Sequence, residues 1–240
     1  MTTATDLAAV IETTYGPLPA LLRAALLEVD RTRFVRLCDR TLAYENLALP
    51  LDTPASPPAP PVSDMIATHG SWLGAALQPE YTASGATISQ PAMYLMAFQY
   101  LELGPGDHYL ELGTGTGYGA ALAAQIVGPA GHVTSVDVDP SLVERARELV
   151  PDTHVTLLCD DALARTDLLA QHAKCWLTFS VPQLPPQLLA AVPEGGRLLA
   201  PIGPPPPAPQ HYLLHRRQLG ELTTEDLGFP VFFIPDRKTR

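Results

Sequence analysis

The stretch YLELGTGTGYGAAL, residues 109–122, decides the fold. An apolar run of strand type, 108–112, ends directly after an acid, and four glycines then occupy alternate positions beginning with Gly113. A helix is predicted over 119–127, so that three of the glycines form the connecting turn. Glycine accepts positive φ angles and lets a ligand approach bare backbone. At the carboxyl end of a strand in an open α/β sheet, such a turn predicts a ligand-binding crevice.

Strand and helix patterns alternate through the rest of the chain. Asp139 and Pro140 mark one helix start especially clearly, as N-cap and first helical residue. Repeated units of this kind predict an α/β fold, a Rossmann-like, doubly wound and mostly parallel sheet with helices on both faces. The predicted strands are 108–112, 132–138, 154–159, 175–181 and 196–202, and the predicted helices are 91–103, 119–127, 140–149, 162–172 and 186–192.

Proline marks the organisation of the 240-residue chain, which has 26 prolines, ten of them in two dense groups at 53–61 and 203–209. The first group separates a helical piece, 18–36, from the glycine motif, and the second is predicted as a stiff tip between two strands. We therefore expect residues 1–90 to form an N-terminal helical extension with a proline-rich insert. Residues 91–240 are expected to form the cofactor-binding catalytic domain, folding with the extension as one cooperative unit.

Composition narrows the function further. A net charge of −10 argues against a nucleic-acid partner. No apolar run approaches the roughly 20 residues that span a bilayer, and the first residues lack a signal-peptide pattern, so we expect a cytoplasmic protein with no membrane partner. Cys38, Cys159 and Cys175 are widely spaced, which predicts small core residues and neither a disulfide framework nor a metal site.

The acid before the turn bears on the choice of ligand. Gly115, Gly117 and Ala120 also satisfy a dinucleotide fingerprint, with Asp137 twenty residues beyond Gly117. A carboxylate at Glu111 would repel a pyrophosphate, whereas S-adenosyl-L-methionine carries a sulfonium, an ammonium and no phosphate. The predicted cofactor is therefore S-adenosyl-L-methionine, bound by Glu111, Gly113, Thr114, Gly115, Gly117, Tyr118, Asp137, Val138, Asp160 and Asp161.

The acids in that set have different alternatives. Asp137 ends a predicted strand and is expected to bind the ribose hydroxyls, because Asp139 already supplies the helix cap. Asp160 and Asp161 follow the next strand, where they are expected to border the adenine. A helix-capping role remains equally open for whichever of these two does not face the pocket.

Several further motifs resemble the protein-L-isoaspartate O-methyltransferase family of class I methyltransferases. The most specific are GATISQPAMYLM, residues 85–96, and PEGGRLLAPIG, residues 193–203. LLRAALLEVDRTRFVR, LAYENLALPL and EDLGFPVFFIP also match. The resemblance implies that Thr87 and Ser89 lie beside the substrate carboxylate, although Ser89 also suits an N-cap before Pro91. It implies a peptide or protein substrate with an aspartyl or isoaspartyl carboxylate, and leaves the oligomeric state unknown.

The chain also departs from the family pattern. Ala86 replaces a glutamine, Cys175 and Trp176 stand where an aspartate is usual, and an insert occupies 52–84. The insert resembles an actinobacterial branch that modifies aspartates in peptide natural-product (RiPP) pathways. We therefore expect carboxyl O-methylation in peptide maturation, with isoaspartyl protein repair as the alternative. The insert is expected either to cover the substrate side as a lid or to pack on the sheet.

Carboxyl methylation agrees with a sequence that has no convincing catalytic cluster, because a carboxylate is already ionised at neutral pH. Met93, Met96 and Phe98 are interpreted as the core face of a helix. Three rival functions are weighed against this one. They are a class I enzyme acting on a nucleic-acid base or another small molecule, an NAD-dependent oxidoreductase, and a binding module that has lost turnover.

Overall fold

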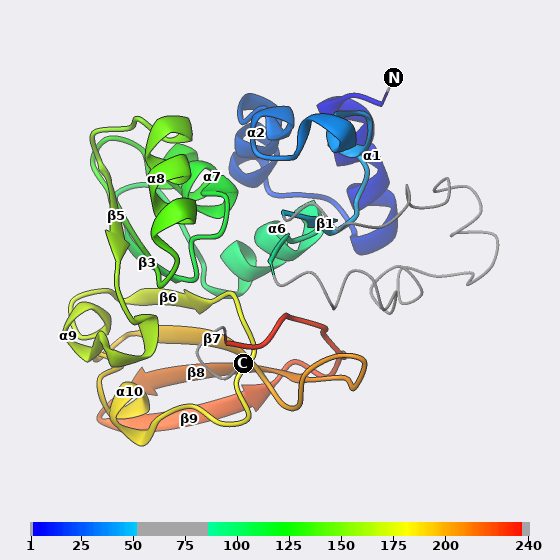
Figure 1. The fold of residues 1–240 in the computed structure, drawn as a ribbon. Coiled ribbons are helices and arrows are strands. Elements are labelled where there is room, and N and C mark those ends of the chain that lie inside the picture. Colours follow the sequence, from blue (N-terminus) through cyan, green and yellow to red (C-terminus); the bar gives the residue numbers. More distant parts are fainter. Residues whose placement is uncertain (1, 52–85, 237–240) are drawn as a thin grey trace.

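The computed structural model describes residues 2–51 and 86–236, and its centre is a seven-stranded sheet (Figure 1). Its strands are β3 (His108–Leu112), β4 (His132–Asp137), β5 (Val155–Cys159), β6 (Lys174–Leu177), β7 (Arg197–Ile202), β8 (His211–Gln218) and β9 (Glu221–Asp226). The spatial order is β5-β4-β3-β6-β7-β8-β9. Strands β3 to β7 are parallel, whereas β8 and β9 are antiparallel to their neighbours.

Helices lie on both faces of this sheet (Figure 1). They are α1 (Ala4–Tyr15), α2 (Ala20–Glu28), η1 (Arg31–Arg33), η2 (Leu37–Leu42), α6 (Pro91–Tyr100), α7 (Tyr118–Val127), α8 (Pro140–Leu149), η3 (Ala162–Ala164), α9 (Thr166–Leu169) and α10 (Pro186–Ala190). A small antiparallel pair, β1 (Leu49–Pro50) and β2 (Thr87–Ile88), lies beside the N-terminal helices. The predicted Rossmann-like, mostly parallel α/β fold is confirmed.

The alternation of side chains along each strand produces two apolar cores. In β3, Tyr109 packs into the core that contains α6 and α7, whereas Leu110 and Leu112 pack into the core that contains α10. Trp176 and Cys175 divide between the two cores in the same way. Both faces of the central parallel strands β3, β6 and β7 are therefore buried, which explains their largely apolar sequences, whereas the edge strand β5 is partly exposed.

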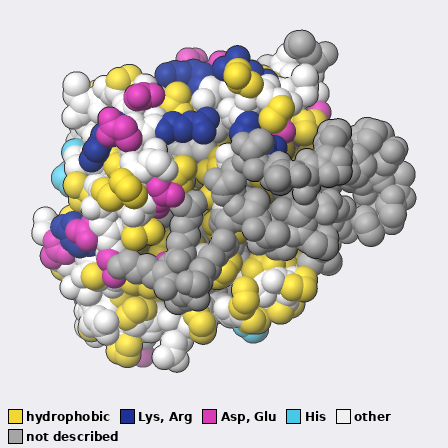
Figure 2. Space-filling model, in the orientation of Figure 1, with side chains coloured by type: hydrophobic (Ala, Val, Ile, Leu, Met, Phe, Trp, Pro, Cys, Tyr) yellow, Lys and Arg dark blue, Asp and Glu magenta, His cyan; other side chains and the backbone are white. Residues whose placement is uncertain are grey.

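The N-terminal helices share the first of these cores with α6 and α7. A fully buried guanidinium, that of Arg31, joins this region to the segment before α6. It donates hydrogen bonds to the carbonyl oxygens of Ala43 (2.9 Å), Glu45 (3.2 Å), Leu47 (2.8 Å) and Ser89 (3.0 Å). Figure 2 shows basic side chains gathered near these helices, with acidic side chains on the same face.

Most of the predicted elements are present with small shifts at their ends. Helix α8 begins as predicted, since Asp139 accepts hydrogen bonds from the backbone of Ser141 and Leu142. Residues 203–209 connect β7 to the antiparallel β8, as expected of a tip. The helix predicted over 162–172 is divided into η3 and α9 at Arg165, whose backbone leaves the helical region. Strand β9 was not predicted, and its exposed, polar residues explain why.

Two predictions about buried residues are wrong in part. Only Cys175 is buried, whereas Cys38 and Cys159 are exposed. Phe98 lies in the core and the partly buried Met93 packs against it, whereas Met96 is partly buried and is not part of that core; both methionines line a cavity. Residues 52–84, predicted as a lid or a packed insert, lie outside the described residues. Across the described ranges, every helix falls short of the length and apolarity that a bilayer crossing requires.

Candidate active site

The glycine turn between β3 and α7 lines a pocket with both polar and apolar walls, named here the main pocket. Gly113, Gly115 and Gly117 all have positive φ angles, of 111°, 54° and 85°. A Cβ atom at Gly113 would lie 2.1 Å from the Thr178 hydroxyl. At Gly117 it would instead press on α8, 3.0 Å from the Cβ of Ala146. Backbone conformation and close packing therefore both require glycine here.

Glu111 lies beneath this turn with only 1% of its surface exposed, yet it lines the main pocket. Its carboxylate accepts a hydrogen bond from Ser135 Oγ (2.6 Å), and Gly119 makes room for it because a Cβ there would lie 2.0 Å from Glu111 Oε1. Burial raises the pKa of Glu111 to about 8, and the nearby charge of Asp137 acts in the same direction. A positively charged ligand would therefore stabilise the ionised form.

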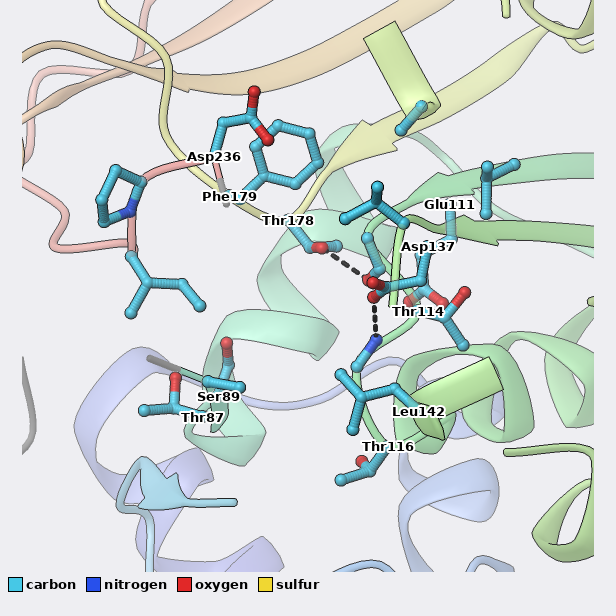
Figure 3. A pocket seen from close by; sticks show the side chains of 18 of the residues that line it. Thr87, Ser89, Glu111, Thr114, Thr116, Asp137, Leu142, Thr178, Phe179 and Asp236 are labelled. Atoms are coloured by element: carbon cyan, nitrogen blue, oxygen red, sulfur yellow. Dashed lines mark hydrogen bonds between the residues drawn. The ribbon is translucent and has the colours of Figure 1, made fainter. Parts of the chain in front are cut away.

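Asp137, at the end of β4, is held in one orientation by backbone donors. Its Oδ2 accepts from the N–H of Gly115 (2.8 Å), and its Oδ1 accepts from the N–H of Asp139 (3.0 Å). The side chain is 8% exposed and lines the main pocket (Figure 3). Because a carboxylate has about four acceptor positions, both oxygens can still receive ligand hydroxyls.

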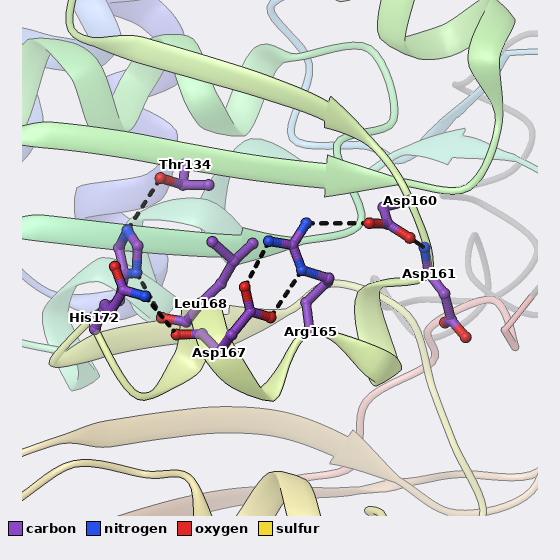
Figure 4. Close-up of polar contacts among 8 residues, drawn as sticks. Thr134, Asp160, Asp161, Arg165, Asp167, Leu168 and His172 are labelled. Carbon is purple, nitrogen blue, oxygen red and sulfur yellow. Dashed lines mark hydrogen bonds and ion pairs between the residues drawn. The ribbon is translucent and has the colours of Figure 1, made fainter.

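Asp160 and Asp161 face different surroundings, as Figure 4 shows. Asp160 forms an ion pair with Arg165 (3.1 Å), which also binds Asp167, and the main pocket does not include it. Asp161 lines the main pocket and also caps η3 by accepting from the N–H of Leu163 (3.2 Å). The sequence left helix capping and a position in the pocket as alternatives. Asp161 has both roles.

Thr87 and Ser89 lie across the main pocket from Glu111 and Asp137 (Figure 3). Pairing of β2 with β1 positions Thr87, and the bond from Arg31 to the Ser89 carbonyl positions Ser89. The interpretation of Ser89 as an N-cap is wrong, because Gln90 occupies the N-cap position of α6 and makes no side-chain capping bond. The Ser89 hydroxyl is thus not required to start this helix.

Three predicted cofactor-binding residues do not line the main pocket: Gly117, Tyr118 and Asp160. Tyr118 is fully buried, with its ring 5.3 Å from that of Phe34 and 5.7 Å from the guanidinium of Arg31. It belongs to the core because the first turn of α7 directs it toward the N-terminal helices. The predicted residues that do line the pocket are Thr87, Ser89, Glu111, Gly113, Thr114, Gly115, Asp137, Val138 and Asp161.

The pocket also contains residues that sequence reasoning missed. Thr178 follows β6 directly and donates hydrogen bonds to the carbonyl oxygens of Gly113 (2.6 Å) and Leu112 (3.1 Å). The C-terminal segment 234–236 reaches the pocket because Ser180 pairs with it, donating from its N–H to the Ile234 carbonyl (2.8 Å). Thr178 was detectable in principle, since it follows a parallel strand at the same sheet edge as the glycine turn.

The fold and the glycine turn place this chain among the Rossmann-like methyltransferases. The model of the family described as protein-L-isoaspartate(D-aspartate) O-methyltransferase matches residues 19–239. A relative from Protochlamydia amoebophila named protein-L-isoaspartate O-methyltransferase is 32% identical over 214 residues, covering 88% of this chain and 85% of that protein. The chain therefore belongs to the protein-L-isoaspartate O-methyltransferase family, and the predicted enzyme class and cofactor, S-adenosyl-L-methionine, are confirmed.

Two solved structures show the same fold. A protein-L-isoaspartate O-methyltransferase superposes with a TM-score of 0.76 at 23% identity, covering 98% of this chain and 66% of that one. A Plasmodium falciparum protein, described as a beta-aspartate methyltransferase in complex with S-adenosyl-L-homocysteine, has a TM-score of 0.73 at 16% identity and covers 98% of each chain. These likenesses extend across the N-terminal helices as well as the sheet.

The described residues suit this cofactor. The turn has no side chain at Gly113 or Gly115, so a ligand can lie against bare backbone there. Four acids line the main pocket, Glu111, Asp137, Asp161 and Asp236, while its described lining contains neither lysine nor arginine. Such a pocket attracts a cationic sulfonium and ammonium and repels a pyrophosphate. The oxidoreductase alternative is therefore disfavoured by the charge of the pocket as well as by the family.

Proposed function

We propose that this protein transfers the methyl group of S-adenosyl-L-methionine to the carboxylate of an aspartyl or isoaspartyl residue in a peptide or protein. The observation that carries the proposal is that one pocket joins the glycine turn and its acids to the hydroxyls of Thr87 and Ser89 (Figure 3). When bound, the cofactor supplies a methyl group activated by a sulfonium. The chain's own residues then have to bind, orient and align the two reactants.

On the cofactor side, each residue has a distinct proposed role. The backbone at Gly113 and Gly115 receives the ligand, and Glu111 balances its positive charge. Asp137, already oriented by Gly115 and Asp139, presents its remaining lone pairs to ribose hydroxyls. Val138 and Asp161, which both line the main pocket, are proposed to border the adenine.

On the acceptor side, the chemistry requires alignment but no general base. A carboxylate with a pKa near 4 is ionised at neutral pH, and the described residues of the main pocket include no histidine or lysine. The hydroxyls of Thr87 and Ser89 can donate hydrogen bonds to this carboxylate and hold one oxygen in line with the methyl group. These hydroxyls lie across the pocket from Glu111 and Asp137, and this separation reduces the repulsion that these two acids exert on the substrate carboxylate.

The biological setting is a finer proposal. Ala86, a buried residue of the main pocket, replaces a glutamine of the family pattern, and the insert at 52–84 resembles the peptide natural-product branch. These two features support maturation of a modified precursor peptide. The relative from Protochlamydia amoebophila, by contrast, is named a protein-L-isoaspartate O-methyltransferase, which favours isoaspartyl repair. The same proposal includes a cytoplasmic location and a peptide rather than a nucleic-acid partner. It also includes the folding of residues 1–90 and 91–240 as one cooperative unit.

The proposal can be tested with synthetic hexapeptides that carry either aspartate or isoaspartate at one position. Incubation with the cofactor is expected to add one methyl group, detected by mass spectrometry and removed again by mild alkali because the product is an ester. A methyl group that survives alkali would assign the acceptor to nitrogen or another atom and refute the proposal. Preference for the isoaspartyl series would support repair, and preference for the aspartyl series would support maturation.

The role of Ser89 is tested with Ser89→Ala. Loss of a hydrogen bond to a charged group costs about 1.5–3 kcal/mol, so kcat/KM for the peptide is expected to fall by about 10- to 150-fold. The affinity for S-adenosylhomocysteine should remain unchanged. Thr13→Ala provides a matched control, because it also removes one hydroxyl, from the exposed face of α1. Equal activity of both variants would contradict the assignment of Ser89.

A further inference from the structure

A second cavity, named here the side cavity, adjoins the main pocket. It has a volume of about 310 Å³ and shares Thr87, Ser89, Thr178 and Ile234 with the main pocket. For comparison, an apolar cavity of about 150 Å³ in another protein holds a benzene molecule. The side cavity is therefore large enough for an aromatic or large aliphatic side chain. It is lined by Thr87 and Ser89, whose hydroxyls are proposed to bind the carboxylate that accepts the methyl group.

The outer wall of the side cavity is the C-terminal segment 229–234, which is held in place by a buried side chain. Gln210, only 2% exposed, donates from Nε2 to the carbonyls of Phe233 (2.9 Å) and Pro204 (2.9 Å), and its Oε1 accepts from the N–H of Phe233 (2.7 Å). Phe229 stacks on Tyr100 with ring centroids 6.4 Å apart. This wall is preformed, so filling the cavity requires little reorganisation.

The opposite wall is the partly buried face of α6, where Met93 and Met96 line the side cavity. Methionine side chains adapt their shape and make favourable contacts with aromatic rings. None of the described residues that line the cavity is charged. A lysine or glutamate side chain of a ligand would therefore lose its hydration without gaining a partner, which is costly.

We propose that the side cavity binds an apolar, preferably aromatic, side chain of the substrate peptide, one or two positions from the methyl-accepting residue. Consecutive Cα atoms are about 3.8 Å apart, so a neighbouring side chain can enter the cavity while the acceptor carboxylate lies at Thr87 and Ser89. The inference rests on the proposed function and adds a substrate preference to it. The occupant is a substrate side chain because the cavity adjoins the acceptor side of the main pocket and shares Thr87 and Ser89 with it.

The test uses three sets of hexapeptides that differ only in the residues flanking the acceptor: phenylalanine, alanine or lysine. Both kcat/KM and the binding affinity for the protein saturated with S-adenosylhomocysteine are measured. Filling an apolar pocket changes specificity by about tenfold or more. We therefore expect phenylalanine in at least one flanking position to raise kcat/KM and binding affinity by that factor over alanine. Lysine peptides should be the poorest in both measurements.

Met96→Trp fills part of the side cavity and is expected to reduce the phenylalanine-to-alanine ratio to about one, without changing the affinity for S-adenosylhomocysteine. Leu37→Trp adds the same ring at an exposed position, 77% accessible, and should leave the ratio unchanged. Equal binding and turnover of the three peptide sets, or an unchanged ratio in Met96→Trp, would overturn the inference.

The proposed function and this inference fail differently. If all peptides gain an alkali-labile methyl group at the same rate, carboxyl methylation stands and the side cavity is not a substrate subsite. If no peptide is methylated, the proposed function fails, and the binding measurement still decides the inference. In that case a phenylalanine preference that disappears in Met96→Trp supports it, and equal affinities overturn it.

Discussion

Gly115 offers the sharpest test of the proposed cofactor site, through Gly115→Ala. Its φ of 54° is unfavourable for alanine, and a Cβ there would meet no protein atom within 4 Å. Since Gly115 lines the main pocket, the added methyl group would extend into open space that the cofactor is proposed to fill. The free energy of unfolding should therefore fall only by the cost of holding alanine in a left-handed backbone conformation, about 1–2 kcal/mol.

Gly220→Ala is the matched control. Gly220 lies in the turn between β8 and β9 and has a φ of 79°, and a Cβ added there would likewise meet no atom within 4 Å. Both variants should therefore lose the same backbone free energy. At about 2–4 °C per kcal/mol for a chain of this size, each is expected to lower the Tm by about 2–8 °C. Differential scanning fluorimetry without ligand checks this equality.

The two variants should then differ in ligand binding. Forcing an extra methyl group against a packed ligand costs about 1–3 kcal/mol, and 1.4 kcal/mol corresponds to about tenfold in affinity. Calorimetry is therefore expected to show S-adenosylhomocysteine binding weakened by about 5- to 150-fold in Gly115→Ala and unchanged in Gly220→Ala. Equal affinities in two folded variants would refute the placement of the cofactor on this turn.

Two further predictions concern buried charges. The pKa of Glu111 is raised to about 8 in the folded protein, so the fold favours the protonated side chain. Without ligand, the free energy of unfolding should therefore fall by up to about 1.4 kcal/mol per pH unit as the pH rises from about 5 to 8. Urea titrations should show a smaller fall in Glu111→Gln and an unchanged fall in the exposed control Glu148→Gln. Arg31→Met removes four hydrogen bonds to carbonyl groups and should lower the free energy of unfolding by about 3 kcal/mol or more. The Tm should then fall by about 6–12 °C. The control Arg33→Met loses one exposed hydrogen bond and should change the Tm little.

The strands, helices and turn of the catalytic region were largely readable from the sequence because their causes are local. Apolar runs, Pro140 at the first position of α8, Asp139 as its cap and the glycines after β3 each act within a few residues. The parallel arrangement then brings the ends of β3 and β4 to one edge, which is why Glu111 and Asp137 could be assigned to one pocket.

Tyr118, by contrast, could not be placed from the sequence. Tyr118 directly follows the glycine turn in the sequence. The first turn of a helix, however, can direct a side chain either into the ligand pocket or into the core. Its ring packs against Phe34 and Tyr94 because the N-terminal helices cover α7. The contact with Phe34 joins segments far apart along the chain, and no local pattern encodes it.

The sequence by itself determined the five parallel strands, the glycine turn and the acids at the strand ends, since local propensity and the alternation of strands and helices are sufficient for these. Only the tertiary structure decided that the segment 234–236 completes the pocket, and it showed that Thr178 lies there as well. It also decided that Asp161 rather than Asp160 faces the pocket, and that the pKa of Glu111 is raised to about 8. The reason is that burial, ion pairing and pocket shape depend on contacts between distant segments, which arise only when the whole chain packs.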